Sequence, residues 1–252
     1  MTSTPTDSKV SVDSFARHSS GQMIPVNSSL SYFSVIPLED TELQRLIYDP
    51  ASAMPLKAGQ MAGKLRIVVV GYLEASEEDP EASPLVVFQP PSEDSRIFST
   101  AVVAEDETYI FLAIKDEDMA DSHDSLYYEL AQAVVMGADD DLLKKFGALL
   151  RQELKNEVRG ELDDRAWKLK DHLLRGDGDI EGRPDEFRAY LEQSLADSLA
   201  LYFHGLCCDI DVEAGPRQLA SKWIRKRLTL LRELLPAPKG VALFPEELPP
   251  TA

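Results

Sequence analysis

The sequence has few cysteines, no long apolar run and no pair of histidines one helical turn apart. No run approaches the roughly eighteen apolar residues that cross a bilayer, so we expect no membrane-spanning helix. The N-terminus lacks a basic segment followed by an apolar one, so we expect no secretory signal. The two cysteines, Cys207 and Cys208, are neighbours, and neighbouring cysteines rarely bridge each other. These features predict a cytoplasmic protein with reduced thiols.

The cysteine pair has two open interpretations. Free cysteines often act as small buried hydrophobes, and Cys207 and Cys208 fall at the end of a predicted helix. The alternative is a redox or metal-binding pair that uses His204 nearby.

Acidic residues outnumber basic ones by 44 to 26, which gives a net charge of −18. Residues 63–125 hold fifteen acids against four bases, whereas residues 215–235 hold six bases against Glu233. An acidic surface argues against nucleic acid as a ligand, because phosphate contacts dominate that affinity. It favours a basic protein partner. An acidic inhibitor that mimics nucleic acid is the alternative.

The first half of the chain reads mainly as strands. Residues 1–29 are rich in Ser and Thr and predict a flexible N-terminal arm. Residues 30–116 contain β-branched runs separated by acidic Pro/Ser loops, which predicts a mainly antiparallel sheet. The short link "EDE" between the last two runs predicts a hairpin.

The second half changes to a helical period over residues 120–235. Gly137 is expected to close the first helix, and residues 236–252 form a proline-rich tail. Strands followed by helices predict a single α+β domain over residues 30–235. The expected helices are 120–137, 139–159, 160–175, 184–206 and 216–235.

The loop "DGDIEGRPDEFR" partly matches a calcium-binding EF-hand loop. Asp177, Asp179 and Glu181 stand at positions one, three and five, and Gly182 provides the turn at position six. Position twelve, which should hold a bidentate glutamate, is Arg188. The alternative is an acidic loop that simply joins two helices.

The last predicted helix combines an apolar stripe with a basic cluster. Its bases Lys222, Arg225, Lys226 and Arg227 crowd the same stretch as the apolar stripe. A basic amphipathic helix is typical of a surface that binds membranes, calmodulin-like partners or nucleic acid. The alternative is a helix whose apolar face completes the core and whose bases meet the protein's own acidic surface.

The stretch "LYYELAQAVV" places an acid, Glu129, in an otherwise apolar helix after a strand. This arrangement resembles the active-site region of zincin metallopeptidases of the gluzincin group, over roughly residues 105–205. The resemblance implies that Tyr128 and Gln132 stand at the positions of the two zinc-binding histidines, and Glu129 at that of the water-activating glutamate. It also implies that Asp197, in "SLADSLALYF", stands at the third ligand position.

Both histidines of the zincin pattern are missing, and tyrosine, glutamine and aspartate make a poor zinc site. The resemblance therefore implies a metal-free pseudoenzyme in which Glu129 lies beside Asp197 across two packed helices. The plain alternative is that Glu129 lies at the edge of the buried face, where Tyr128 and Gln132 hydrogen-bond it.

The sequence predicts a non-catalytic interaction, scaffold or regulatory protein with a protein partner and no cofactor. The zincin resemblance adds that it is a pseudo-metallopeptidase. The enzyme alternative is a metal-dependent hydrolase that draws unusual ligands from Glu129, Asp197, His204 and the cysteine pair.

Overall fold

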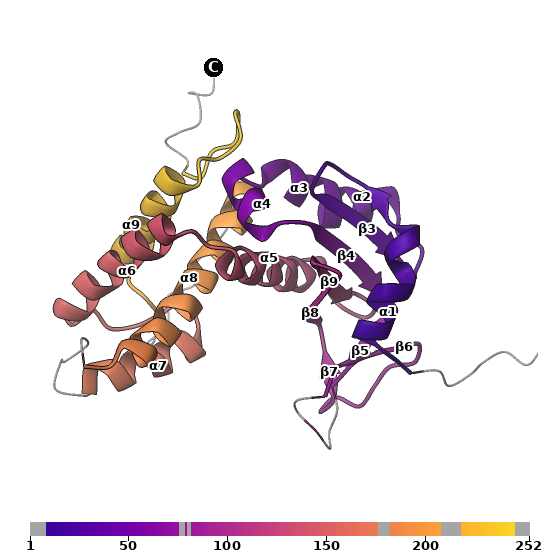
Figure 1. Cartoon of the computed structure of the whole chain (residues 1–252), viewed down its shortest axis with the longest axis horizontal. Coiled ribbons are helices and arrows are strands. Elements are labelled where there is room, and N and C mark those ends of the chain that lie inside the picture. The colour runs from indigo at the N-terminus through magenta and orange to yellow at the C-terminus, as the bar shows by residue number, and fades with distance from the viewer. Residues whose placement is uncertain (1–8, 76–78, 80–81, 176–181, 208–217, 245–252) are drawn as a thin grey trace, which may run out of the picture. The chain divides into compact units, whose positions relative to one another are not determined.

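The computed structural model describes residues 9–75, 79, 82–175, 182–207 and 218–244 (Figure 1). The chain forms two compact units, and each is described by itself. The first comprises Met1–Ser52 with Gly63–Leu130, and the second comprises Ala53–Ala62 with Ala131–Ala252. Helices α3 (Asp49–Ala53) and α5 (Met119–Met136) each run from the first unit into the second.

The first unit contains two sheets. The smaller has the strand order β1-β6-β5-β7 and is antiparallel throughout. The larger has the order β2-β3-β4-β9-β8. Its three central strands β3, β4 and β9 are parallel, and its outer strands β2 and β8 are antiparallel to their neighbours. The elements that lie wholly within this unit, in chain order, are β1 (Val10–Ser11), α1 (Val12–Ser19), η1 (Ser20–Gln22), β2 (Ile24–Pro25), β3 (Leu30–Ser34), α2 (Asp40–Leu43), the π-helical turn η2 (Gln44–Tyr48), β4 (Leu65–Val70), β5 (Tyr72–Glu74), β6 (Leu85–Val87), β7 (Arg96–Ile97), β8 (Ser99–Ala104) and β9 (Glu107–Ala113).

The described part of the predicted flexible arm 1–29, residues 9–29, contains a helix and short strands. Helix α1 packs on one face of the larger sheet, where Val12 and Ala16 are fully buried against Val68 and Phe111. The Ser11 side chain accepts a hydrogen bond from the backbone N–H of Ser14 and so caps this helix. Ser11 is one of the serines that suggested a flexible arm. Serine is also favoured at helix N-termini, so its abundance does not distinguish the two cases.

Strands β8 and β9 form the expected hairpin. Ala104 pairs with Glu107, which leaves Glu105 and Asp106 as a two-residue turn. Both turn residues have positive φ, 54° and 59°, the backbone that a type I′ turn requires. This turn places β8 at the edge of the larger sheet, beside the strand that leads into α5.

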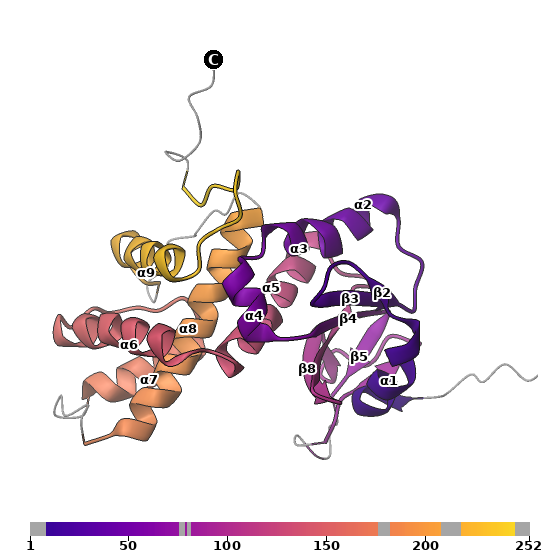
Figure 2. The same cartoon turned by 45° about the horizontal axis from the view of Figure 1, so that its top comes forward.

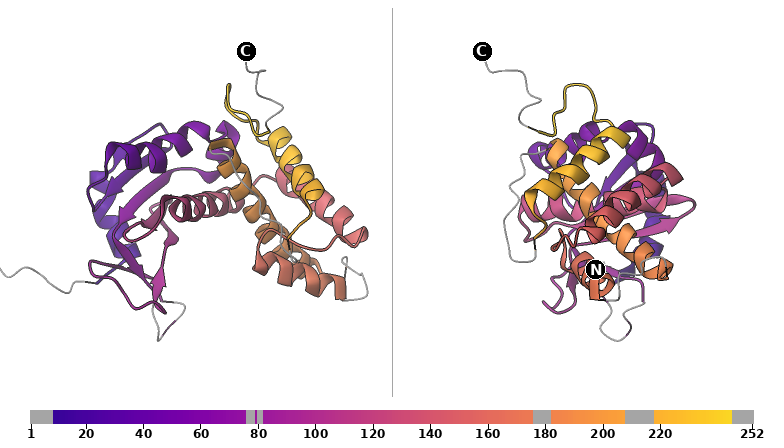
Figure 3. Two further views of the ribbon diagram at one scale, coloured as in Figure 1. Left: turned by 180° about the vertical axis from the view of Figure 1, so that it is seen from behind. Right: turned by 90° about the vertical axis from the view of Figure 1, so that its left-hand side faces the viewer.

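The second unit is helical and is built around α8 (Pro184–Cys207), which contacts each of α6 (Asp140–Lys155), α7 (Asp164–Arg175) and α9 (Ser221–Leu234) (Figures 1 and 2). Residues 193–199 of α8 are all buried, as expected of a helix surrounded by others. Helices α6 and α9 also contact each other (Figure 3). Helix α4 (Leu56–Ala62) belongs to this unit as well.

Gly137 ends α5 at the position that the sequence predicts. A Cβ atom at Gly137 would lie 2.0 Å from the backbone carbonyl oxygen of Met61, far inside van der Waals contact. Glycine is therefore required here by the close approach of α4.

The protein is α+β, with N-terminal sheets followed by a helical half, as predicted. Antiparallel pairings predominate among the described strands, although the centre of the larger sheet is parallel. The helices expected in the second half form within a few residues of their predicted bounds. In the described part of the chain, no helix is long and apolar enough to cross a membrane.

Candidate functional site

The acid in "LYYELAQAVV" is buried, with Glu129 only 9% exposed on α5. The hydroxyl of Ser99, on the edge strand β8, donates a hydrogen bond of 2.8 Å to Glu129 Oε1. Burial raises the pKa of Glu129, and the hydrogen bond from Ser99 opposes part of that rise. Tyr128 and Gln132 flank it on the same helix, each half-buried. Glu129 is thus a buried carboxylate held by a hydroxyl from the sheet.

Asp197 lies in the buried middle of α8 and belongs to the second unit, whereas Glu129 belongs to the first. The side-chain amide of Gln193 donates a hydrogen bond of 2.8 Å to Asp197 Oδ1. Its other oxygen, Oδ2, is buried and has no hydrogen-bond partner among the described residues. Burial raises the pKa of Asp197 to about 7. The expected neighbourhood of Glu129 and Asp197 stays a prediction.

The predicted metal ligands are only partly within the described residues. Asp177, Asp179 and Glu181 of the calcium-like loop lie outside them, as does Cys208. Cys207 is a free thiol of intermediate exposure. Within the described ranges, no three His, Cys, Asp or Glu side chains are grouped so that they could hold a metal ion.

A cluster of four buried charged side chains lies at the centre of the second unit. Arg227 of α9 is fully buried, and it makes two hydrogen bonds to each of two carboxylates. Its guanidinium nitrogens lie 2.6 and 2.9 Å from Glu153 of α6, and 2.7 Å from both oxygens of Glu161. Lys170 of α7 completes the cluster, with its ammonium 2.9 Å from Glu161. We call Arg227, Lys170, Glu153 and Glu161 the buried charge cluster.

Neutral polar groups make further hydrogen bonds to the side chains of the buried charge cluster. The hydroxyl of Ser194 accepts from Arg227 at 2.9 Å, and the phenol of Tyr190 donates to Glu161 at 2.5 Å. The backbone carbonyl of Gly160 accepts from Lys170 at 3.0 Å. Burial would raise the pKa of Glu161, but the charges of Arg227 and Lys170 lower it to about 2. Two cations balance two anions, and the cluster ties together α6, α7, α8 and α9 rather than offering an open site.

Sequence reasoning placed Arg227 with the surface bases of the last helix, and the structure corrects that placement. Arg227 lies three residues after Ile224 and four before Leu231, so it shares their buried face. Lys170 occupies the same kind of position between Ala166 and Leu173 on α7. The available signal was a charged residue on the buried face of each of three helices, namely Glu153, Lys170 and Arg227. The fourth charge, Glu161, lies outside the helices and gave no such signal.

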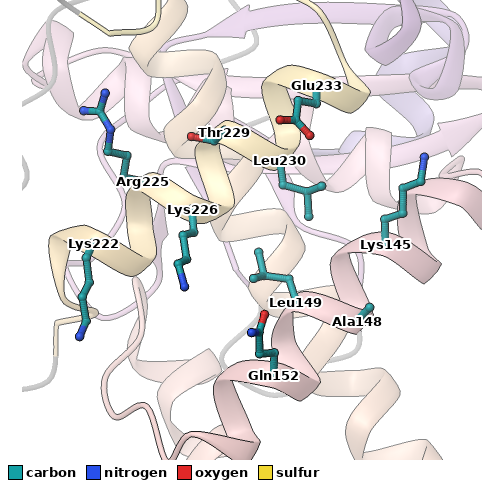
Figure 4. Close-up of a pocket in the computed structure, with 10 residues that line it drawn as sticks. All are labelled: Lys145, Ala148, Leu149, Gln152, Lys222, Arg225, Lys226, Thr229, Leu230 and Glu233. Atoms are coloured by element: carbon teal, nitrogen blue, oxygen red, sulfur yellow. The ribbon is translucent and has the colours of Figure 1, made fainter.

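Three other bases of α9 line a groove between α6 and α9, with a volume of about 640 Å³ (Figure 4). Lys222, Arg225 and Lys226 come from α9 and Lys145 from α6, and Glu233 is the acid among the lining residues. The remaining lining residues are Ala148, Leu149, Gln152, Thr229 and Leu230. The groove therefore has a positive rim in a chain with a net charge of −18.

Aromatic rings hold two of the groove's cations in place. The ammonium of Lys226 lies 3.9 Å from the centroid of the Trp223 ring, and the guanidinium of Arg225 lies 4.2 Å from that of Phe244. Such cation–π contacts stabilise a cation without neutralising it. Figure 4 shows Leu149 and Leu230 extending toward each other between the two helices. The groove thus combines fixed positive charge with an apolar floor.

Comparison of the chain with protein-family models, with curated proteins and with solved structures finds no match.

Proposed function

We propose that this protein is a non-catalytic binding protein and that the groove between α6 and α9 binds a negatively charged ligand. The observation that carries the proposal is the concentration of Lys145, Lys222, Arg225 and Lys226 around one groove. Like charges repel when they are gathered on one surface. The four cations outnumber the lining acid Glu233 and the nearby Asp141, whose carboxylate lies 2.9 Å from Lys145. A ligand of opposite charge removes that repulsion and gains from the attraction.

We also propose that the α5 region is the frame of a metal-free pseudo-metallopeptidase. Two features support this proposal. Helix α5 follows the sheet, and the edge strand β8 contacts Glu129 through Ser99. The three residues at the ligand positions, Tyr128, Gln132 and Asp197, lack the imidazoles that supply most zinc affinity.

We expect the full chain to bind fluorescently labelled poly-L-glutamate, measured by fluorescence anisotropy. The double variant Lys145→Glu with Lys222→Glu changes one cation on each wall of the groove and should lower the affinity by at least about tenfold. Raising the salt from about 50 to 300 mM should weaken binding to the unaltered chain, because ions screen exposed charges.

A matched control separates the groove from overall charge. Lys168 on α7 and Arg188 on α8 are exposed cations that do not line the groove. The double variant Lys168→Glu with Arg188→Glu makes the same change in net charge and should leave the affinity close to that of the unaltered chain. Equal losses in the two double variants would contradict the proposal.

The hydrolase alternative predicts a different outcome. A zinc site with ligands drawn from Glu129, Asp197, His204 and the cysteine pair would leave about one equivalent of zinc in protein that has been purified and dialysed. We expect elemental analysis to find only a small fraction of an equivalent. Stoichiometric zinc, lost in a Glu129→Ala variant, would replace the pseudoenzyme proposal with the hydrolase.

A further inference from the structure

We infer that the ligand of this groove is an amphipathic α-helix of another protein, with acidic residues beside an apolar stripe. This inference rests on the proposed function, since it identifies the partner of the same groove. Its three supports are the shape of the groove, the order of charges along it, and the acidity of the rest of the chain.

The shape fits a helix. Helices α6 and α9 contact each other, and the side chains that line the groove come from both of them (Figure 4). Two neighbouring helices present a channel that a third helix fills by packing its side chains between their ridges. The lining residues of α9 run from Lys222 to Glu233. That span corresponds to about 16 Å of helix axis, or about three turns of a ligand helix.

The order of groups along α9 defines the ligand's pattern. Lys222 and Lys226 stand one turn apart at one end, Leu230 follows one turn later, and Glu233 closes the other end. A complementary helix carries acids one turn apart, then a large apolar residue over Leu230 and Leu149, then a base opposite Glu233. Ala148, which is small and exposed, leaves room for the ligand backbone to approach α6.

The charge of the whole chain favours such a compact ligand over a long polyanion. Nucleic acid carries a continuous row of phosphates, and those beyond the groove would meet a protein of net charge −18. Phosphates would also leave the apolar floor of Leu149 and Leu230 exposed to water. An acidic helix places its charges only where the groove has cations, and it covers the floor with apolar side chains.

The test compares two peptides of about fifteen residues with identical composition and net charge. The first places Glu and Leu at the spacings above, and the second has them scrambled so that no amphipathic face forms. We expect the patterned peptide to bind the full chain about tenfold more tightly, because burying one or two leucines contributes that much. Far-UV circular dichroism of the mixture should show added helix compared with the separate components.

Variants of the groove floor provide the matched control. Leu230→Gln should remove most of the preference for the patterned peptide while leaving the affinity for poly-L-glutamate nearly unchanged. Leu56 is 78% exposed on α4 and does not line the groove. Leu56→Gln should alter neither affinity.

The outcomes separate this inference from the proposed function. Equal affinity for both peptides, with loss on charge reversal of Lys145 and Lys222, would keep the anion-binding groove and overturn the helical partner. Tighter binding of a short DNA duplex, or of vesicles rich in anionic lipid, than of the patterned peptide would also overturn it. Binding of neither peptide nor poly-L-glutamate would overturn the proposed function itself.

Discussion

Replacing Arg227 with methionine is expected to lower the free energy of unfolding by about 3–5 kcal/mol, a large fraction of the roughly 5–15 kcal/mol that is typical of a folded domain. Methionine fills a similar volume, so the loss does not come from a cavity. It comes from Glu153 and Glu161, which would remain buried with only Lys170 to balance them. Urea unfolding followed by circular dichroism measures the change.

The shape of the guanidinium matters as well as its charge. Arg227→Lys keeps the cation but loses the planar fork that meets both carboxylates in pairs. We expect it to be less stable than the unaltered chain by about 2 kcal/mol, between arginine and methionine. Arg165, exposed on α7, provides the control, and Arg165→Met should change the stability by less than about 0.5 kcal/mol.

A second substitution should rescue part of this loss. Adding Glu161→Gln to Arg227→Met leaves Lys170 facing Glu153 alone, so the buried charges balance again. The double variant should be more stable than Arg227→Met alone by about 1 kcal/mol or more. A double variant whose loss equals the sum of the single losses would show that the four charges do not act together.

Lowering the pH should reduce the difference in free energy of unfolding between Arg227→Met and the unaltered chain. The pKa of Glu161 in the folded chain is about 2, below its unfolded value. Its stabilising contribution is therefore present above about pH 4.5 and is lost as the pH falls toward 2. In the methionine variant that contribution is already gone. Protonation of the two carboxylates at low pH also removes the cost of burying their charges without Arg227. A gap that stays constant from pH 7 to pH 3 would contradict the proposed role of Arg227.

Local patterns in the sequence predicted the elements better than their arrangement. The "EDE" link predicted the β8–β9 hairpin because two residues with positive φ suffice for that turn. The parallel centre of the larger sheet was missed. Its neighbours β3, β4 and β9 are brought together by crossovers such as the helical segment of residues 40–62, which has no strong apolar period of its own.

The candidate site shows the same limit at the level of side chains. The basic character of the last helix was visible, and three of its bases do line a groove. The burial of Arg227 was not, because it depends on carboxylates that arrive from residues 74 and 66 positions earlier. Single-helix periodicity can place a charge on the apolar face, but only packing can supply its partner.

The Asp197→Asn substitution is expected to stabilise the protein at pH 8, the opposite of what most buried substitutions do. Asp197 is 7% exposed, and its Oδ2 is buried with no hydrogen-bond partner in the described part of the chain. Burial raises its pKa to about 7, helped by the nearby carboxylates of Asp163 and Glu161, whereas Gln193 and Arg227 act in the opposite direction. At pH 8 the folded chain must hold this charge in the core.

The sign of the pH dependence follows from that raised pKa. Between about pH 4 and pH 7 the folded chain holds a proton on Asp197 that the unfolded chain has released, so the contribution of Asp197 to stability falls as the pH rises. Asparagine carries no charge at any of these pH values. The variant should therefore match the unaltered chain near pH 4.5 and exceed it at pH 8 by up to about 4 kcal/mol.

Urea unfolding of both chains at pH 5 and pH 8 measures this difference, and the comparison cancels the titration of every other group. Asp185 lies exposed in the first turn of the same helix, where a negative charge favours the helix N-terminus. Asp185→Asn should therefore lower the free energy of unfolding by up to about 1 kcal/mol, and by the same amount at both pH values. An Asp197→Asn chain that is no more stable than the unaltered one at pH 8 would mean that the buried carboxylate is stabilised by its surroundings, and that the helix α8 core depends on the charge rather than tolerating it.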